Sequence, residues 1–456
     1  MTFQFSLYGQ NRDIYVNGTT GNDSTGNGTL GAPFATIPRA LQDLPYLITS
    51  RIHIRVAAGT YTAWPAYLDH RFGGDGQLTI EGTGSVTEIL AEQTTTTAAL
   101  VGTSGYSGMD LTVSGAGWTA DQYYGKFVLM TSGSANGYRF PIFKNTTDTI
   151  RVPTNWFGVS SGDKFKIVDP PVSISVNHPI VIRGDKDGRL TAARLGFGNL
   201  ILETTVTSFA DNAALQFLNS TAIVSFSRLK GLDPATDTFL GLGASLLNGV
   251  GLFDSAGFDD SITASVWQPA LAIEAGTGPS STVAQGSPAV KIWADTFNFA
   301  GLSGAVCRGR IDASSGGVRI NMTQSQFGTL GIHEMSSLNM NACAQDLGSL
   351  TGFPGVNVKS NSQARVLSTY FEKCDEAFEM ESNSSLWVYD CQNASGNLTY
   401  GISLGSLCRV IRTDTSTTLG AGGTADIYYF TTAGTASWPA SKTNVNDGRG
   451  ADVVTN

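Results

Sequence analysis

The last third of the chain contains a sequence repeat with a period of 22 residues. The segments VNVKSNSQARV, FEMESNSSLWV and YGISLGSLCRV align without a gap and begin at Val356, Phe378 and Tyr400. The alignment also superposes one serine from each segment, at Ser362, Ser384 and Ser406. A fixed period of this size is typical of a solenoid, in which each turn buries its apolar face against its neighbours.

Each copy of the repeat predicts two short β-strands joined by a tight bend. Apolar residues alternate at period two, as at Val356 and Val358, and do not recur at helical spacing. Between the strands stands a residue that tolerates a left-handed backbone, namely Asn361, Asn383 or Gly405. We therefore predict an all-β chain that forms a parallel β-helix, with the serines stacked as a polar ladder beside the bend.

The repeat also divides the chain into five parts. Looser copies such as LTIEGTG and VSISVNHPIVIRGD predict early turns over residues 51–116 and a main coil over 171–412. Between them, residues 117–170 predict an inserted module of antiparallel strands, with SGSANG as a hairpin turn. Residues 1–50 are expected to form an attachment segment and a cap, and residues 413–456 a tail for trimer or attachment contacts.

The cap is predicted to contain one short amphipathic helix, in the segment PFATIPRALQDL. Thr36 is a suitable N-cap residue, and Pro38 fits the first helical turn. An apolar face follows at i, i+3, i+4 and i+7, formed by Ile37, Ala40, Leu41 and Leu44. Such a helix would shield the bare core and the unpaired backbone at the end of a stack of strands.

Two motifs near the N-terminus carry a resemblance to a known family. One is IYVNGTTGNDSTGNGTLGAPFATI from Ile14, and the other is IHIRVAAGTYT from Ile52. Together they resemble the start of right-handed parallel β-helix proteins of the pectate-lyase-like superfamily, and most closely the tailspikes of phage-type virions. The resemblance implies sugar recognition along the flank of the coil and homotrimers; some members cleave polysaccharide and others only bind it. The inserted module is likewise similar to a small module of bacteriophage structural proteins.

Composition supports the β assignment and excludes several functions. The chain has 54 glycines, 41% hydrophobic and only 14% charged residues, which favours strands and turns and argues against disorder. Its net charge of −9 argues against nucleic-acid binding, which needs a basic surface. The chain lacks an apolar run of about 18 residues, so we expect no membrane insertion. It also lacks a signal peptide, so we expect the protein to be assembled in the host cytoplasm.

Neither a cofactor nor a metal site is predicted. The five cysteines include no CxxC pair and the four histidines are scattered, so we expect free thiols that fill the core. Asp254, Asp259 and Asp260 could bind calcium, but their spacing differs from that of the EF-hand loop. Asp69 and His70 are similar to an Asp-His run of pectate lyases, whose Arg-x-Pro-x-x-Arg element has no counterpart here, so lyase chemistry is disfavoured.

If the protein is an enzyme, Glu379 and Glu381 are the predicted catalytic pair. When Phe378 and Met380 point inward, both glutamates point outward about 7 Å apart, near the lower limit for an inverting glycoside hydrolase. The alternative is an ordinary solvated surface, because the repeat places Lys359 beside Glu381 and predicts a salt bridge. Further candidate carboxylates on the neighbouring turn are Glu372, Asp375 and Asp390.

The strand that follows predicts a binding surface. The alignment places Arg365, Trp387 and Arg409 in one outward column, at a strand spacing of about 4.8 Å. A tryptophan between two arginines forms a cation–π stack, which is either structural or a platform for an acidic sugar ring. Further candidate binding residues are Tyr370, Tyr389 and, on an earlier turn, Trp293.

The repeat, the resemblance and these residues together favour a non-catalytic virion spike or fibre. We expect it to act at the bacterial cell surface, to bind bacterial surface polysaccharide and to assemble as a homotrimer with other virion proteins. One alternative is a depolymerase of host capsule or lipopolysaccharide, a hydrolase rather than a lyase. The other alternative is a purely structural virion decoration protein.

Overall fold

The computed structural model is almost entirely β-structure, as predicted. It describes residues 11–65, 70–73, 76–101, 108–152, 158–178, 180–183, 195–204, 318–345, 354–372, 374–393, 400–405 and 408–412, with further strands between 215 and 314 and between 425 and 454. For residues 180–183, 204–317 and beyond 410, the description covers backbone alone. No helix in the described part of the chain is long and apolar enough to cross a membrane.

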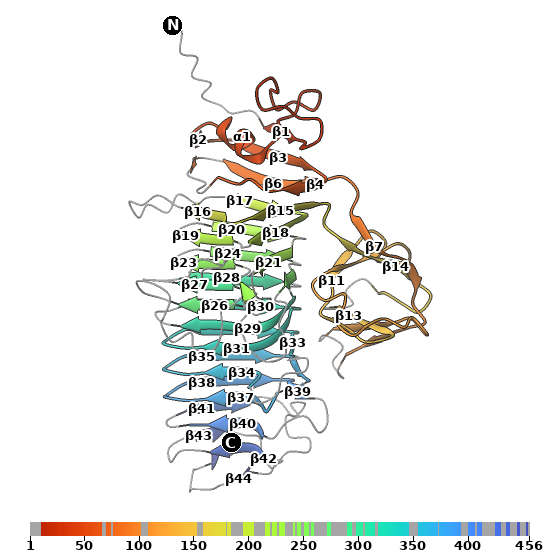
Figure 1. Cartoon of the computed structure of the whole chain (residues 1–456). Helices are drawn as coiled ribbons and strands as arrows, with labels where there is room; N and C mark the ends of the chain where they lie inside the picture. Colours follow the sequence, from red (N-terminus) through yellow and green to blue (C-terminus); the bar gives the residue numbers. More distant parts are fainter. Residues whose placement is uncertain are drawn as a thin grey trace.

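Two large sheets of mainly parallel strands make up the body of the molecule. Among the described residues, one sheet has 14 strands and runs from β1 (Arg12–Val16) through β3 (Arg51–Ala57) to β45 (Val453–Val454). The other has 21 strands and includes β15 (Val172–Val176). Successive segments of the chain add strands to both sheets, and Figure 1 shows these strands stacked in layers from one end of the body to the other.

The strand pairing confirms the first step of the repeat and corrects the second. The repeat forms β34 (Val356–Val358), β37 (Glu376–Met380) and β40 (Tyr400–Leu404) in one sheet, and β35 (Gln363–Leu367), β38 (Ser385–Tyr389) and β41 (Arg409–Arg412) in the other. Val356 lies opposite Phe378, the predicted step of 22 residues. Phe378, however, lies opposite Ile402 instead of Tyr400, so the next step is 24 residues.

The longer step displaces two predicted neighbours. Arg409 lies opposite Ser385, whereas the 22-residue alignment wrongly places it opposite Trp387. The partner of Glu379 in β40 is Ser403. A displacement of two residues keeps every side chain on its predicted face, because side chains alternate along a strand with a period of two. The apolar pattern is therefore the same for steps of 22 and 24 residues.

Two of the three predicted bend residues, Asn361 and Asn383, have the predicted left-handed backbone. Asn361 and Asn383 have φ angles of 62° and 60°. The side-chain amide of Asn383 donates a 2.8 Å hydrogen bond to Asn361 Oδ1 in the adjacent layer. Beside the bends, three almost fully buried serines are stacked, namely Ser336, Ser362 and Ser384. Ser406, the remaining predicted serine, lies outside the described residues.

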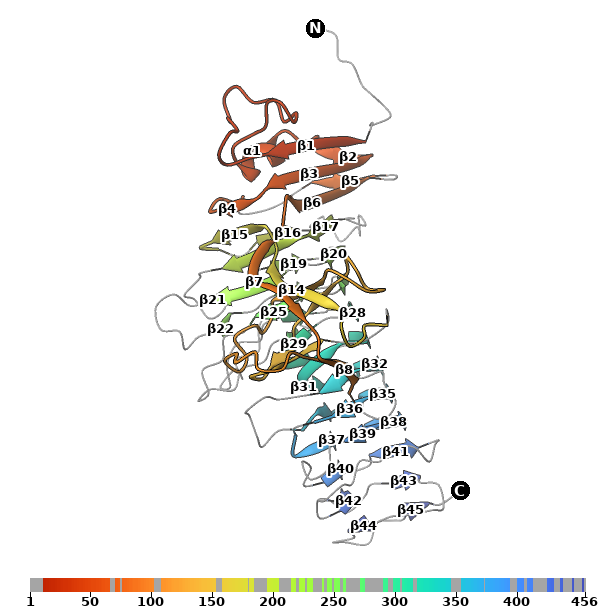
Figure 2. The ribbon, with the colours of Figure 1, turned by 90° about the vertical axis from the view of Figure 1, so that its right-hand side faces the viewer.

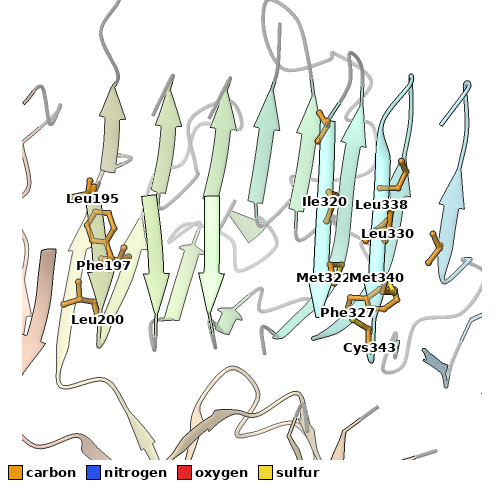
Figure 3. Packing of buried hydrophobic residues seen from close by; sticks show 14 of the residues in the cluster. Leu195, Phe197, Leu200, Ile320, Met322, Phe327, Leu330, Leu338, Met340 and Cys343 are labelled. Atoms are coloured by element: carbon orange, nitrogen blue, oxygen red, sulfur yellow. The ribbon is translucent and has the colours of Figure 1, made fainter. Parts of the chain in front are cut away.

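Inward-pointing side chains stack into one continuous apolar core. Consecutive layers align the buried residues Leu338, Ala364, Leu386 and Val410. Figure 3 shows other layers of this core, which include Phe197, Ile320 and Met322. The rings of Phe371 and Phe378 pack edge to face, with their centroids 5.0 Å apart. Burial of these side chains stabilises the stack of strands.

Cysteine side chains fill this core as free thiols, as predicted. The described cysteines are all buried, namely Cys343, Cys374, Cys391 and Cys408. Burial raises the pKa of the Cys343 thiol to about 12, so this thiol stays protonated. The remaining cysteine, Cys307, belongs to β29 (Val306–Ser314), whose side chains lie outside the described residues.

A short helix, α1 (Ile37–Gln42), lies at the N-terminal end of the body, beside β1 and β3 (Figure 1). It begins at the predicted N-cap, where the Thr36 hydroxyl accepts a 3.3 Å hydrogen bond from the backbone N–H of Arg39. Asp23 holds this cap in place, because its Oδ2 accepts a 2.7 Å hydrogen bond from the Thr36 hydroxyl. The apolar face of the helix is buried in the core through Ile37, Ala40 and Leu41.

A separate module of antiparallel strands lies alongside the body. One of its sheets contains β7 (Thr87–Thr94), β10 (Phe127–Met130), β11 (Arg139–Pro141) and β14 (Lys164–Asp169). The other contains β8 (Thr97–Leu100), β9 (Met109–Thr112), β12 (Lys144–Asn145) and β13 (Thr149–Val152). The module therefore begins at Thr87, and the boundary predicted at residue 117 is wrong. Period-two alternation does not reveal whether a strand pairs in parallel or antiparallel.

The module is attached to the body by a cluster of charged side chains. Lys144 Nζ lies 2.7 Å from Glu372 Oε1, and Arg151 forms a second ion pair with the same carboxylate. Arg151 also binds Asp110 of the module through two hydrogen bonds, of 2.7 and 2.9 Å. Both views of the chain place the module beside the middle of the body (Figures 1 and 2). Glu372, predicted as a candidate catalytic carboxylate, therefore anchors the module.

Replacing Glu372 with Ala should loosen the module from the body. The change removes the carboxylate that Lys144 and Arg151 share, which we expect to weaken docking by about 1–3 kcal/mol. Labelling of Lys144 by an amine-reactive reagent, followed by mass spectrometry, should then become several-fold faster.

The matched control is Glu88→Ala, which removes a more exposed carboxylate paired with Lys166 within the module. Exposed ion pairs contribute about 0–1 kcal/mol, so the labelling rate of Lys144 should not change. Equal rates in Glu372→Ala and the unsubstituted protein would contradict the anchoring role.

Candidate functional site

Two surfaces meet at the bend between β37 and β38. We call the first the carboxylate cluster; it consists of Glu376, Glu379 and Glu381 with Lys359. The second is the Trp387 face, which comprises the outward positions of β30 (Val318–Thr323), β32 (Ser337–Asn341), β35, β38 and Arg409. Because β37 and β38 belong to different sheets, the two surfaces point in different directions.

Lys359 draws two carboxyl groups of the cluster together. Its ammonium lies 3.0 Å from Glu381 Oε1, which confirms the predicted salt bridge, and 3.8 Å from Glu379 Oε2. Asn357 Nδ2 donates a 2.5 Å hydrogen bond to Glu379 Oε2. The neighbouring Glu381 carboxyl group raises the pKa of Glu379, so the two groups interact directly. An inverting hydrolase instead keeps its two carboxyl groups about 6.5–9.5 Å apart, with a water between them.

Burial makes the cluster partly protonated near neutral pH. It raises the pKa of Glu376 to about 7, with further increases from the negative charges of Glu379 and Asp375. A weak hydrogen bond from the Ser403 hydroxyl, 3.5 Å from Glu376 Oε1, acts in the opposite direction. Burial also raises the pKa of Glu379, although the positive charge of Lys359 limits the increase.

Glu376 was not among the predicted catalytic residues. The alternation in the sequence could have identified it. Residues 376, 378 and 380 lie on the same side of the strand, and Phe378 and Met380 are fully buried. A glutamate in the buried phase of a strand is unusual and marks a carboxylate that is shielded from water.

The raised pKa of Glu376 predicts a pH dependence of stability. The folded state binds an additional proton between the ordinary pKa of 4.5 and about 7. The stabilisation is therefore complete below pH 4.5 and is lost as the pH rises through about 7. Melting temperatures between about pH 4 and 8 should fall with pH more steeply for the unsubstituted protein than for Glu376→Gln. A constant difference between the two proteins would contradict this prediction.

The Trp387 face presents two exposed aromatic side chains from one strand. Trp387 and Tyr389 are 43% and 46% exposed, whereas Leu386, which precedes Trp387, and Val388, which lies between the two, are buried. The Arg365 guanidinium of the adjacent strand lies 5.3 Å from the centroid of the Trp387 ring, which confirms this half of the predicted cation–π column. Because the buried neighbours fix the strand, the aromatic rings stand on a rigid support.

The remaining predicted site residues lie elsewhere. Tyr370 belongs to β36 (Tyr370–Phe371), near the charges of Glu372 and Arg151 where the module is attached. Asp390 lies in a bend with a φ of 50° and accepts a long, 3.4 Å hydrogen bond from the Ser368 hydroxyl. Trp293 ends β27 (Val290–Trp293), whose side chains are not among the described ones.

No group of three or more metal-ligating side chains occurs among the described residues. The predicted acids Asp254 and Asp259 end β24 (Val250–Asp254) and β25 (Gly257–Asp259), for which only the backbone is described. Asp69 and Asp260 lie outside the described residues.

Comparison with known proteins gives low similarities. No protein-family model and no curated protein matches the chain. Among solved structures, the chain is similar to the Gp54 tailspike of Acinetobacter baumannii bacteriophage AP22, solved in complex with A. baumannii capsular saccharide. The identity is 9% and the TM-score 0.25, over 88% of this chain and 71% of that chain.

Two further solved structures show the same level of similarity. The lacto-N-biosidase of family GH136 from Eubacterium ramulus has 8% identity and a TM-score of 0.27, over 93% of this chain and 67% of that chain. The tailspike protein gp49 from Pseudomonas phage LKA1 has 8% identity and a TM-score of 0.22, over 90% of this chain and 71% of that chain. Similarities with TM-scores this low support no conclusion, so the function has to be inferred from the residues of this chain.

Proposed function

We propose that this protein is a virion-associated spike or fibre that binds bacterial surface polysaccharide through the Trp387 face. The observation that carries this proposal is the pair of exposed aromatic side chains, Trp387 and Tyr389, on one rigid outward strand. A pyranose ring has an apolar face of C–H groups that packs flat on an indole or phenol ring. Tyr and Trp are enriched at binding surfaces, where the ring packs on a ligand and the polar end of the side chain forms hydrogen bonds.

The polar surroundings of the aromatic pair suit a sugar ligand. Arg365 is the strand partner of Trp387, and Asn339 is the partner of Arg365 one strand further. The Arg365 side chain can donate hydrogen bonds to ring hydroxyl groups, and the Asn339 amide can both donate and accept them. The strands that carry these residues are fixed by backbone pairing and by their buried neighbours. A preformed, rigid surface loses little conformational entropy on binding, which favours affinity.

The proposed architecture is a right-handed parallel β-helix that assembles as a homotrimer. The alternation of buried and exposed residues, the left-handed bends at Asn361 and Asn383 and the two stacked parallel sheets support the β-helix. The trimer, the right-handed coiling and the contacts with other virion proteins are implied by the resemblance of the N-terminal motifs. We assign these contacts to the N-terminal segment and to residues 413–456.

Replacing Trp387 with Ala should reduce polysaccharide affinity about 10- to 100-fold. The substitution removes a central aromatic anchor, and such anchors commonly contribute about 1.4–2.8 kcal/mol or more to binding. Isothermal titration calorimetry with purified host capsule or lipopolysaccharide measures the effect, and sedimentation equilibrium shows whether the assembly is intact.

The matched control is Tyr138→Ala, which removes a similarly exposed aromatic side chain from the module, 45% exposed. Its affinity should equal that of the unsubstituted protein. Failure of the unsubstituted protein to bind any host polysaccharide would favour the structural decoration role instead.

A second candidate function is hydrolysis of the polysaccharide at the carboxylate cluster. The observation that favours it is the pKa of Glu376, which at about 7 lies where a glycosidase general acid requires it. Glu381, held by Lys359, would then be the partner carboxylate. The direct interaction of Glu381 with Glu379 counts against the predicted catalytic pair, since an inverting hydrolase needs its carboxyl groups apart.

Hydrolysis is tested by the release of reducing ends from host capsule. If the cluster is catalytic, Glu376→Gln and Glu381→Gln should each lower the rate at least 100-fold while polysaccharide binding remains. Glu81→Gln, which alters a carboxylate at the other end of the body, is the control. Binding without new reducing ends, and without the ultraviolet absorbance of unsaturated lyase products, would identify a non-catalytic binder.

A further inference from the structure

The Trp387 face carries positive charge and no negative charge. Its outward positions in the described residues are Arg319, Asn321 and Thr323, then Ser337, Asn339 and Asn341, then Gln363, Arg365 and Leu367, then Ser385, Trp387 and Tyr389, and finally Arg409. Arginines occur at three of these positions, and neither aspartate nor glutamate occurs at any. This is notable in a chain whose net charge is −9.

The charge changes sign across a single bend. Before the bend at Ser382 and Asn383, β37 carries two glutamates, Glu376 and Glu379, and Glu381 directly follows the strand. On the far side, β38 carries aromatic and hydroxyl side chains between the arginines of β35 and β41. Within one turn of the chain, the two surfaces therefore have opposite electrostatic potentials.

We infer that the ligand of the Trp387 face is a polyanionic polysaccharide, with carboxylate groups on its sugar residues. This inference rests on the proposed function and names its substrate class. The Arg365 guanidinium lies over one face of the Trp387 ring, 5.3 Å from its centroid. A sugar ring packed on the remaining surface of the indole has a carboxylate on its rim within reach of this guanidinium. Guanidinium groups bind carboxylates through paired, charge-assisted hydrogen bonds, and the adjacent indole orients the guanidinium.

A second cation lies on the opposite side of Trp387. Because of the 24-residue step, Arg409 stands opposite Ser385, on the strand that follows β38 and displaced by two residues from Trp387. Arg365 precedes β38 and Arg409 follows it, so exposed arginines lie on both neighbouring strands. A polymer that crosses the strands therefore meets a cation before and after the aromatic platform.

The direction of the polymer follows from the same register. Asn321, Asn339, Arg365 and Trp387 are consecutive partners in the sheet, so they form one column perpendicular to the strands. The amides supply donors and acceptors for sugar hydroxyl groups on one side of Trp387, and the column continues on the other side to Ile411, the partner of Trp387 in β41. The carboxylate cluster around the bend repels a polyanion, which confines the polymer to the Trp387 face.

Binding should be measured with a panel of purified bacterial capsular polysaccharides, some with uronic or sialic acids and some neutral. Each acidic polymer is paired with its carboxyl-reduced form, in which the carboxylates are converted to alcohols. We expect binding to the acidic polymers only, at least tenfold weaker binding after carboxyl reduction, and a steep decrease in affinity as NaCl rises from about 50 to 500 mM.

The arginine variants connect this preference to the Trp387 face. Arg365→Gln and Arg409→Gln should each weaken binding of the acidic polymers about tenfold, and each should weaken the residual binding of the carboxyl-reduced forms by a smaller factor. The matched control is Arg51→Gln, an exposed outward arginine in β3 of the same sheet, distant from Trp387, which should bind as the unsubstituted protein does.

Each contrary outcome has a distinct meaning. One outcome is that neutral polymers bind, and that this binding is abolished by Trp387→Ala but not by the arginine variants. In that case the polyanion inference is wrong and the proposed function stands. If no polysaccharide binds, the proposed function itself fails. If Trp387→Ala or Arg365→Gln dissociates the assembly in sedimentation experiments, the face is a contact between subunits, which also overturns the inference.

Discussion

Register between parallel strands is the constraint on which the rest of this structure depends. Each strand forms hydrogen bonds with a strand from the next segment of the chain, so every residue has its partner directly above or below it. Inward positions must then be apolar in layer after layer, and bends must recur at the same place. The Asn361–Asn383 amide contact, the buried serines and the Lys359–Glu381 ion pair are all consequences of this vertical alignment.

Outward positions are free of this constraint, and they are where the molecule differs from layer to layer. The two sheets present separate surfaces, because a bend divides β37 from β38. One surface collects glutamates around Lys359, and the other collects arginines and aromatic side chains around Trp387. The module occupies a further part of the body and uses Glu372 as its anchor. A single stack of strands thus carries three surfaces with different chemistry.

Local patterns were sufficient to predict much of this arrangement. The phase of burial, the bends at Asn361 and Asn383, the N-cap at Thr36 and the stacking of Arg365 on Trp387 all follow from residues close in sequence or one repeat apart. The predicted strand partner of Arg409 was wrong, because one connection is two residues longer than the repeat. Two additional residues leave the alternation unchanged, so the sequence pattern does not reveal them. The start of the module failed for a related reason: alternation shows that β7 is a strand but not which partner it takes.

The amino-acid sequence by itself determined which side chains are buried and where the chain bends, because both depend on side-chain polarity and backbone preference over a few residues. The tertiary structure decided which residues became neighbours. Glu372 meets Lys144 across 228 residues, and Arg409 lies opposite Ser385 instead of Trp387. Such contacts depend on the lengths of connections and on the path of the module, and neither is encoded in any local pattern.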